Sequence, residues 1–453
     1  MLGPDLVGAV SNGRLLFGFA LGLILWRAAV AAYNFFLHPL RRFPGPMFAT
    51  QKLHERYGPV VRIASGYLSF TDVRAYKDIY GSLAVRSKTN SNGPALEMPK
   101  AAAFYDPIDD VPTVIVNAGR EEHQRVRRAV SQGFSEAALR QYEPVIGRYV
   151  GQLLRQMHER SGAPLDCAAW YMWATFDIAA KPVFGKPIGC LDACAYHPPV
   201  VQLLFRTFGQ LAMTRHKAFT DSMVHHRLAT DKGRNDLLGT LISEGSGGQR
   251  LRFHVGRVRN MAAALSGIMY LLLTNPGALA RLREEVRSTF SSAAEIKIGP
   301  VSKLPCLSAV LSKGLRAYPP QPTDLVRVVP AGGGVIAGHS VAGGVQPWSI
   351  SHSRDHWAAP RPSPERFLAS DDEARRAGNR LEALQPFSSG PRSCIGRPLV
   401  YAEMRLILAR IMFEIDDMKP HDADTSSSDW IRPLRGYPLW DRPPLKVRFT
   451  IRT

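Results

Sequence analysis

The chain has 453 residues, of which 45% are hydrophobic, and it carries a formal net charge of +19. This length and apolar content allow a large buried core and exclude a low-complexity chain, so we expect one large globular domain or two closely joined ones. The lysines and arginines are spread along the whole chain without a recognition helix or an RNA-binding signature, which excludes a nucleic-acid-binding protein. A basic surface suits anionic lipid headgroups or an acidic partner protein.

The N-terminal segment has the composition of a membrane anchor. Residues 15–26 form an apolar run, and apolar character resumes after Arg27 and continues to residue 37. About 20 apolar residues are needed to span a bilayer, so a span here must tolerate Arg27, whose side chain would reach toward the interface. No small-residue cleavage site follows, as one would after a secretory signal peptide. The basic pair Arg41 and Arg42 favours a cytoplasmic location for the rest of the chain.

Helical periodicity dominates the rest of the chain. Short β signals occur at residues 60–63 and around residues 327–329, and irregular chain rich in Pro and Gly then runs to residue 395. We find no internal repeat and no linker between independent domains. We therefore expect a mainly α fold with small β-sheets (α+β), in which residues 1–40 are a membrane anchor and residues 41–453 one domain. The helices are predicted at residues 121–130, 135–157, 170–180, 261–274, 276–290, 307–317 and 399–413.

The cysteines are too few and too irregularly spaced for a disulfide framework in a chain of this length, so a reducing compartment fits better. Cys190 and Cys194 lie four residues apart beside His197, which raises the question of a metal site. No second pair of Cys or His at zinc-site spacing follows, so we reject that interpretation. The five cysteines are Cys167, Cys190, Cys194, Cys306 and Cys394.

The most informative stretch is residues 386–397, with the sequence PFSSGPRSCIGR, directly before the last predicted helix. A cysteine just ahead of a helix N-terminus gains backbone N–H donors and the positive end of the helix dipole, so Cys394 is favoured as a thiolate. Gly390 and Gly396 allow positive φ or a close approach of the backbone to a ligand. Phe387 can pack beside the sulfur. These properties suit the thiolate ligand of a haem iron.

The spacing F-x-x-G-x-R-x-C-x-G resembles the haem-binding loop of the cytochrome P450 superfamily. The resemblance extends over nearly the whole chain and is strongest toward fungal microsomal members of secondary metabolism. Residues 364–367 resemble the P-E-R-F element of the family, residues 311–320 its K-helix, and residues 121–136 its C-helix. The implied fold is a cytochrome P450-like fold with an N-terminal membrane helix.

The resemblance implies haem b (iron protoporphyrin IX) as the cofactor, with Cys394 as the axial ligand of the iron. Arg392, Arg127 and Arg327 are then the expected partners of the haem propionates. His123 stands where many members of the family have Trp. The implied haem-binding residues are Cys394, Phe387, Gly390, Arg392, Gly396, His123, Arg127 and Arg327.

The same resemblance implies a monooxygenase that hydroxylates or epoxidises a hydrophobic small molecule. Electrons would come from NADPH through NADPH–cytochrome P450 reductase, and membrane lipid would be a further partner. The implied location is the endoplasmic reticulum, with a single-pass anchor and a cytoplasmic catalytic domain. Residues 87–116 and 203–224 would line the substrate pocket, but neither carries a decodable signature.

Two segments depart from the family pattern. The K-helix normally carries Glu-x-x-Arg, whereas this chain has Lys313 opposite Arg316, so an ion pair becomes a repulsion expected to cost on the order of several kcal/mol. The I-helix of related proteins contains Ala-Gly-Ser-Glu-Thr, whereas residues 256–260 read Gly-Arg-Val-Arg-Asn. Arg259 then stands at the acid position and Asn260, the candidate catalytic residue, at the alcohol position. Asn260 can orient a water, but it is a poor proton donor.

A frame slip in the gene model would account for the altered I-helix segment. Residues 256–261 can be encoded as GGC CGG GTC CGA AAC ATG. Read one base later, the same bases give GCC GGG TCC GAA ACA, which encodes Ala-Gly-Ser-Glu-Thr. We therefore hypothesise that the segment before Met261 is translated out of frame.

Two other interpretations of the chain stay open at this point. In the first, the protein binds haem but is catalytically impaired, because its I-helix and K-helix motifs are degraded. In the second, it is a basic protein of the membrane surface in which Cys394 has only a structural role. The spacing of the cysteine motif favours haem binding, in an active or an impaired enzyme, over a purely structural role of Cys394.

Overall fold

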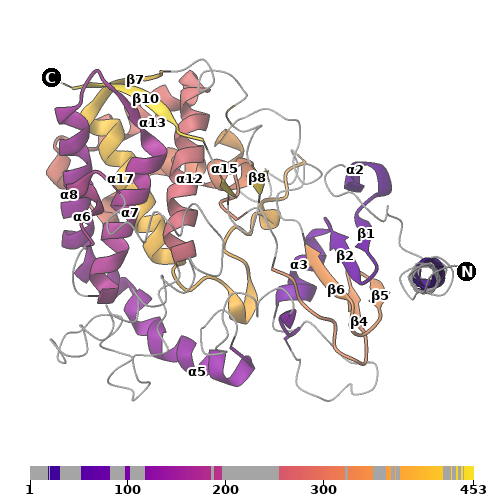
Figure 1. Ribbon diagram of the computed structural model, residues 1–453. Coiled ribbons are helices and arrows are strands. Elements are labelled where there is room, and N and C mark those ends of the chain that lie inside the picture. The colour runs from indigo at the N-terminus through magenta and orange to yellow at the C-terminus, as the bar shows by residue number, and fades with distance from the viewer. Residues whose placement is uncertain are drawn as a thin grey trace, which may run out of the picture. The chain divides into compact units, whose positions relative to one another are not determined.

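A computed structural model describes the chain at residues 19, 21–30, 53–81, 97–102, 118–184, 188–195, 255–321, 325–349, 364–368, 373, 378–421, 430, 435–436, 440–441 and 443–452. The chain divides into two compact units (Figure 1). The first consists of Met1–Ala101 and Val326–Ile350, and the second of Ala102–Leu325 and Ser351–Thr453. Each unit is described by itself below.

The first unit is built around a three-stranded sheet of order β1-β2-β6. β1 (Val60–Ala64) and β2 (Tyr67–Phe70) form an antiparallel hairpin, and β6 (Gln346–Ser349) pairs with β2 in parallel although it comes much later in the chain. The β-branched residues of β1 suit a half-buried strand, and the strand predicted at residues 60–63 is confirmed. The other elements of this unit are α2 (Leu53–Tyr57), α3 (Val73–Tyr80), β4 (Gly334–Ile336) and β5 (His339–Val341).

The β segment predicted around residues 327–329 forms an isolated bridge, between Arg327 and Lys100, and not a regular strand. Its N–H groups bond alternately to two neighbours, because Val328 donates to the carbonyl of Pro99 and Val329 to that of Val345, both at 2.8 Å. The next residue is a proline, which has no N–H group and cannot continue a ladder. The extended conformation is confirmed, but the proline limits its length.

The second unit is mostly helical, and each helix predicted from periodicity is present. Most of the ends differ from the prediction by a few residues, but the helix predicted at residues 261–274 begins six residues earlier, at Val255. The smaller shifts are of the size expected where helix ends fray or where a cap lies outside the apolar pattern. Ser135, for example, is the N-cap of its helix and accepts from the N–H of Ala138 at 3.2 Å. The confirmed helices are α5 (Arg120–Ser131), α6 (Glu136–Glu159), α7 (Cys167–Phe184), α12 (Val255–Leu273), α13 (Pro276–Thr289), α15 (Pro305–Ala317) and α17 (Arg397–Glu414).

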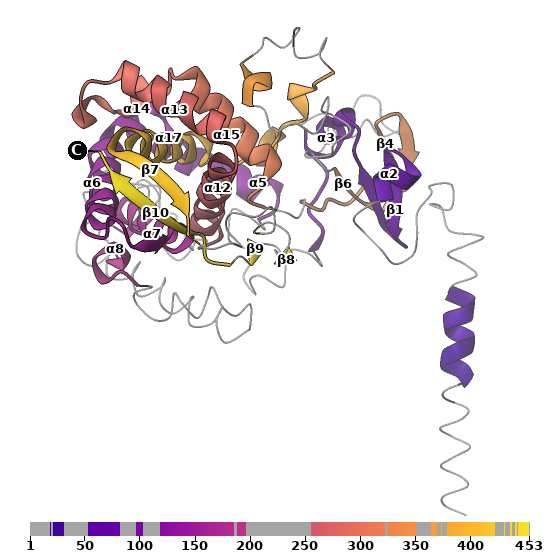
Figure 2. The same cartoon turned by 90° about the horizontal axis from the view of Figure 1, so that it is seen from above.

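Helix α12 is the centre of this unit and packs against α7, α13, α15 and α17 (Figure 2). Residues 261–270 are all buried. A helix that is apolar on every side must be covered on every side, which explains its central place. Helix α17, which follows Cys394 along the chain, is similarly buried over most of its length and packs against α6 and α13.

A three-stranded antiparallel sheet of order β3-β10-β7 adjoins the helices, and the sequence analysis did not predict it. β3 (Pro164–Asp166) is too short to give a periodic signal, while β7 (Ile415–Pro420) and β10 (Lys446–Ile451) come from the chain beyond the last predicted helix. β10 alternates exposed and buried residues, as a strand with one covered face does. The two remaining strands are β8 (Arg435–Gly436) and β9 (Trp440–Asp441), which pair with each other.

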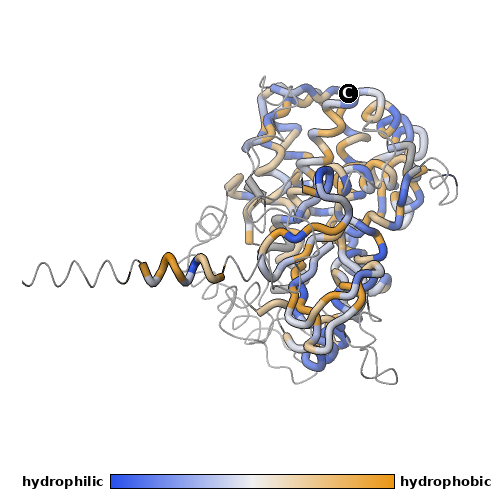
Figure 3. The backbone as a smooth tube through the Cα atoms, turned by 90° about the vertical axis from the view of Figure 1, so that its right-hand side faces the viewer, coloured by the Kyte–Doolittle hydropathy of each residue, from blue (hydrophilic) through white to orange (hydrophobic). Residues whose placement is uncertain are grey.

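The prediction of a mainly helical fold with small sheets is confirmed, but its N-terminal membrane helix is not supported. Within the described residues, no single helix is both long enough and apolar enough to cross a bilayer. The N-terminal part contains a shorter apolar helix, Leu21–Val30. Its side chains at Ile24, Leu25 and Trp26 are each more than 60% exposed, and the segment stands out as apolar in Figure 3.

Candidate haem-thiolate site

The predicted cysteine loop, residues 386–396, folds back on itself immediately before α17. The N–H of Cys394 donates to the carbonyl of Phe387 at 2.8 Å, which closes the loop. Gly390 has a φ of +72°, so the predicted need for a glycine at this point is confirmed. Ser388 also has a positive φ, of +59°, which is uncommon for a residue with a side chain. The loop is therefore held in a specific conformation that its neighbours must stabilise.

Cys394 presents an accessible thiol at the N-terminal end of α17. Among the five cysteines, all of which lie within the described residues, it is the exposed one, and the others are buried or half-buried. An exposed thiol contributes little to packing, so a purely structural role for Cys394 is not supported.

Gly396 lies beside the cysteine sulfur with a φ of −79°, so it does not need the conformational freedom of glycine. A Cβ atom placed on Gly396 would lie 3.9 Å from Cys394 Sγ and 3.8 Å from the ring of Phe134, both ordinary contacts. Nothing inside the protein therefore requires a glycine here. The missing side chain leaves room beside the sulfur for a group packed against the backbone.

Two arginines tie the cysteine loop to the segment around α5. Arg127 of α5 donates to the carbonyl of Ser393 at 2.6 Å and to its hydroxyl at 3.3 Å. In the reverse direction, Arg392 of the loop donates to the carbonyl of Ala118 at 2.7 Å. The structure thus places two of the three predicted propionate partners, Arg127 and Arg392, at the loop. A guanidinium carries five N–H donors in a planar arrangement that suits a carboxylate.

The two other predicted haem-binding side chains are buried. His123 lies on α5 one turn before Arg127 and is 3% exposed. Arg327 belongs to the first unit, whereas Cys394 belongs to the second. Arg327 is 1% exposed, with its guanidinium carbon 5.3 Å from the centre of the Tyr80 ring, so it is not a plain surface charge. A buried guanidinium gains from such an aromatic face.

Asn260 lies in the first half of α12 and is half-buried. Its side-chain oxygen is buried, and no described residue donates a hydrogen bond to it. A buried amide oxygen without a donor is unfavourable, so this atom calls for a water or a ligand group. The side chain of Arg259 lies outside the described residues.

The residue that departs from the family pattern in the K-helix, Lys313, is a buried cation. Lys313 on α15 is 6% exposed and Arg316 is half-buried, and the helix contains no acidic residue. Lys313 lines a cavity of about 30 Å³ whose other walls are mainly apolar. Burying a cation in such surroundings is costly unless it is paired, and the predicted repulsion from Arg316 stays a prediction. The other lining residues are Ile268, Leu271, Leu272, Asn275, Ala278, Val310, Gly314 and Pro364.

The structure shows a close approach of α12 and α15 that the sequence analysis missed. A Cβ atom on Gly267 would overlap the ring of Tyr318, and one on Gly314 would overlap the side chain of Ile268. Glycine inside a helix is unfavourable by about 1 kcal/mol relative to alanine, so two such glycines in neighbouring helices were an available signal. They allow the central helix to pack directly against the K-helix.

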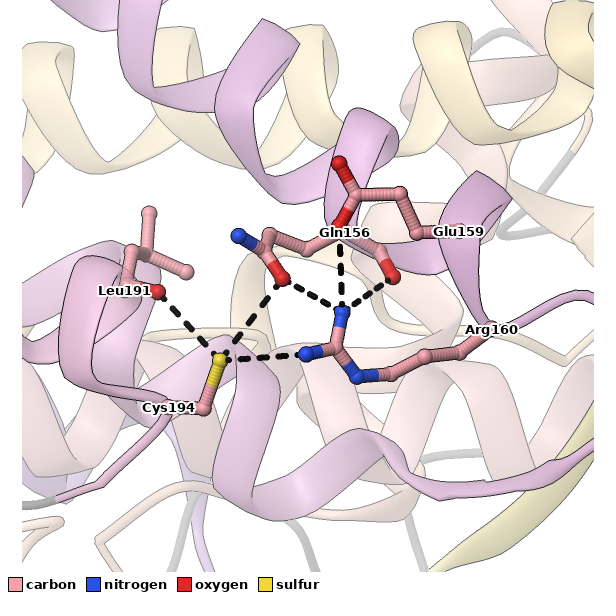
Figure 4. A network of polar contacts seen from close by, with 5 residues as sticks. All are labelled: Gln156, Glu159, Arg160, Leu191 and Cys194. Atoms are coloured by element: carbon pink, nitrogen blue, oxygen red, sulfur yellow. Dashed lines mark hydrogen bonds and ion pairs between the residues drawn. The ribbon is translucent and has the colours of Figure 1, made fainter.

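The rejected metal site at Cys190 and Cys194 has an electrostatic argument against it. Cys194 Sγ lies 3.5 Å from Arg160 Nη2 and 3.6 Å from Gln156 Oε1 (Figure 4). A guanidinium at this distance repels a metal cation. His197, the third candidate ligand, lies outside the described residues.

Taken together, the loop offers an accessible thiol, a glycine beside the sulfur and two arginines. These groups fit a planar cofactor that carries a metal to be ligated and carboxylates to be neutralised.

The sequence pattern of the cytochrome P450 family matches residues 31–208 and 206–429. Among curated proteins, the chain is 38% identical to the cytochrome P450 monooxygenase tpeC of Talaromyces stipitatus, over 93% of this chain and 92% of that protein. It is 33% identical to averantin hydroxylase of Dothistroma septosporum, over 98% and 95% of the two chains. It is 32% identical to trichothecene C-15 hydroxylase of Fusarium sporotrichioides, over 94% and 96%.

The alignments extend over nearly the full lengths of these relatives, which are monooxygenases and hydroxylases. The comparisons therefore favour an active enzyme over an impaired haem protein. They also confirm the resemblance to fungal proteins on which the sequence analysis relied. The chain therefore belongs to the cytochrome P450 family and is a monooxygenase, an oxidoreductase that uses a haem-iron cofactor.

Proposed function

We propose that this monooxygenase hydroxylates or epoxidises a hydrophobic small molecule of secondary metabolism, with haem b (iron protoporphyrin IX) bound through the thiolate of Cys394. The observation that carries the proposal is the exposed Cys394 thiol ahead of α17, in a loop closed by the Phe387 carbonyl. When bound, the haem supplies the activation of O₂ and the insertion of one oxygen atom into the substrate.

The residues of the chain hold the cofactor and control its surroundings. The N-terminal end of α17 stabilises the negative charge on Cys394, and Phe387 shields the sulfur. Arg127 and Arg392, which contact the loop, neutralise the propionates with their guanidinium groups. The same role is proposed for the buried Arg327, and His123 completes the set from α5.

Asn260 is proposed to hold a water. Its buried amide oxygen would accept a hydrogen bond from that water. An amide does not release a proton at neutral pH, so protons must pass through the water itself. Proton delivery through Asn260 is therefore expected to be slower than through a hydroxyl group.

The relatives support the substrate class. Two of them are named for hydroxylation of averantin and of a trichothecene at C-15. We propose a lipophilic substrate of comparable chemical class for this chain. Of the predicted pocket-lining residues 87–116 and 203–224, only residues 97–102 lie within the described part of the chain.

Electrons are proposed to come from NADPH through NADPH–cytochrome P450 reductase, which the basic charge of +19 would help to dock. We further propose that the chain is held at the endoplasmic reticulum membrane by a single-pass anchor in residues 1–40, with a cytoplasmic catalytic domain and contact with membrane lipid. The exposed apolar side chains of Leu21–Val30 support an anchor in this segment.

The ferrous carbon-monoxide difference spectrum tests the assignment of Cys394. The wild-type protein is expected to show the red-shifted Soret band of thiolate-ligated haem, and Cys394→Ala to lack it. Cys194→Ala serves as the matched control, because this half-buried cysteine lies elsewhere in the same unit, and it should keep the band. Survival of the band in Cys394→Ala would exclude Cys394 as the ligand.

Turnover tests the function. The purified protein, combined with a fungal reductase and NADPH, is expected to oxidise lipophilic polyketides or terpenoids, with incorporation of one atom of labelled O₂ into the product. A thiolate-type spectrum without oxidation of any substrate in a broad panel would favour the impaired haem protein.

A further inference from the structure

A stack of aromatic and arginine side chains connects the cysteine loop to α17. The ring of Phe387 lies 5.2 Å from that of Tyr401, centre to centre. The guanidinium carbon of Arg397 lies 6.0 Å from the centre of the first ring and 5.8 Å from that of the second. On Tyr401, Arg405 adds a second guanidinium at 5.1 Å. We call Phe387, Arg397, Tyr401 and Arg405 the Tyr401 stack.

Tyr401 is the member of the stack that touches all the others. Its neighbour Arg405 is half-buried, and the Nε atom of that arginine is buried without a hydrogen-bond partner among the described residues. Burial lowers the pKa of Arg405 and raises the pKa of Tyr401, so both groups have lost part of their hydration. A cation with little hydration gains most from an aromatic face. The ring of Tyr401 is therefore the main stabilising contact of this guanidinium.

Phe387 connects the Tyr401 stack to Cys394. Its backbone carbonyl accepts the hydrogen bond from the Cys394 N–H, and the residue that follows it, Ser388, has the uncommon φ of +59°. Such a conformation persists only where the surroundings determine it. The packing of the Phe387 ring on Tyr401 helps to hold the backbone of Ser388 in this conformation. A shift of the Phe387 ring would therefore move the Phe387 carbonyl, which orients Cys394.

The other end of the stack reaches α15. Arg405 Nη2 lies 3.5 Å from the hydroxyl of Ser308, in the first half of that helix. In this chain α15 contains no acidic residue and carries Lys313 where the family has a glutamate. The contact through Arg405 is therefore a link between α15 and the cysteine loop that does not depend on the family ion pair.

We propose that Tyr401 is a positioning residue for thiolate ligation. Held between Arg397 and Arg405, its ring fixes Phe387 and thereby the orientation of Cys394 toward the iron. This inference rests on the proposed role of Cys394 as the haem ligand. It concerns the geometry and redox properties of the iron site, not the binding of the substrate.

Substitution at Tyr401 in the full-length haem protein tests the proposal. Tyr401→Leu removes the aromatic face and is expected to lose most of the thiolate-type carbon-monoxide band at equal haem content, with a shift of the haem midpoint potential. Tyr401→Phe keeps the ring and is expected to retain both the band and the potential. Equal bands and potentials in the Leu variant and the wild type would overturn the proposal.

A matched control separates positioning from a general loss of stability. Tyr76→Leu removes a half-buried ring from another aromatic pair, with Tyr80 at 4.6 Å, in the first unit. It is expected to lower thermal stability without changing the ratio of thiolate-type to other carbon-monoxide bands. The same change of ratio in Tyr76→Leu and Tyr401→Leu would overturn the proposal.

A second pair of variants decides the question if Tyr401→Leu does not fold. Arg405→Met keeps the length of the side chain but removes the cation, whereas Arg405→Lys keeps the cation. We expect the Met variant to lose thiolate-type ligation and the Lys variant to preserve most of it, and identical spectra would overturn the proposal. Failure of the proposed function is distinguishable, because Cys394→Ala would then keep the band of the wild type.

Discussion

Glu403 is a carboxyl group buried in the middle of α17, nine residues after Cys394. It is 2% exposed, and its Oε2 atom has no hydrogen-bond partner among the described residues. Burial raises its pKa from the usual 4.5 to about 8, so the side chain is mostly protonated at neutral pH. An uncharged acid in the core of the helix that follows Cys394 is a feature that sequence reasoning did not identify.

The raised pKa makes the stability of the protein depend on pH. Because the folded-state pKa of Glu403 is above the unfolded value, the unfolded chain binds fewer protons between pH 4.5 and 8, and the free energy of unfolding falls as the pH rises through this window. By pH 7, Glu403 has lowered the free energy of unfolding by on the order of 3 kcal/mol relative to its value below pH 4.5. Glu403→Gln should remove this slope and be more stable at pH 8. Urea unfolding from pH 5 to 8 measures it, with the exposed Glu121→Gln as control, and parallel curves for Glu403→Gln and wild type would contradict the prediction.

Lys313 is the residue-scale departure with the clearest energetic consequence. Its side chain is buried beside a mainly apolar cavity, three positions before Arg316 on the same helix. Lys313→Glu should raise the free energy of unfolding by about 1–3 kcal/mol, because an acid at this spacing can pair with the arginine. Chemical denaturation measures the change. Lys313→Met removes the cation without adding a partner for Arg316. An equal rise in the free energy of unfolding in both variants would mean that the only effect is the removal of a desolvated ammonium group.

At the scale of elements, the glycines between α12 and α15 determine how closely the two helices pack. Gly314→Ala should destabilise the protein by about 1–3 kcal/mol, because the new methyl group overlaps the side chain of Ile268. Gly147→Ala in α6 is the matched control. A Cβ atom there meets nothing within 4 Å, so this variant should gain up to about 1 kcal/mol from helix propensity. Thermal unfolding of the two variants gives opposite signs if the packing argument holds.

The altered segment of the I-helix remains helical in this chain, since α12 begins at Val255 and includes residues 255–260. The helix therefore does not reveal whether the segment is native. The transcript does: we expect the codons for residues 256–260 to read Ala-Gly-Ser-Glu-Thr in the next frame. Any other codons in the sequenced transcript would end the frame-slip hypothesis and leave Arg259 and Asn260 as true residues of the enzyme.

Helix positions were predictable because an apolar periodicity is a local property of the sequence. The predicted ends differ from the observed ones where caps and short extensions lie outside that periodicity, as at Ser135 before α6. The sheet β3-β10-β7 was not predictable, because it pairs three short segments that are far apart in the chain. The glycine contacts of α12 and α15 were missed for the same reason, since each glycine is only informative together with its partner helix.

At the scale of the whole molecule, the N-terminal segment is the part expected to meet the membrane. Ile24→Asp combined with Leu25→Asp in the full-length chain should move most of the protein from the membrane pellet to the supernatant, because charged residues are costly in hydrocarbon. Val335→Asp, which changes another exposed apolar residue in the first unit, is the control and should leave the distribution unchanged. Pelleting of the double variant with the membranes would show that attachment lies elsewhere.

The sequence alone determined the class of fold, the family and the cysteine proposed to carry the chemistry, because residues 386–397 are contiguous and their spacing is specific. The tertiary structure decided how that loop is held. The bonds of Arg127 to Ser393 and of Arg392 to Ala118, and the ring of Tyr401 on Phe387, join residues that are separate in the chain. These contacts follow from the packing of helices, which no local pattern encodes, and this is why the sequence could single out Cys394 but not the residues that contact its loop.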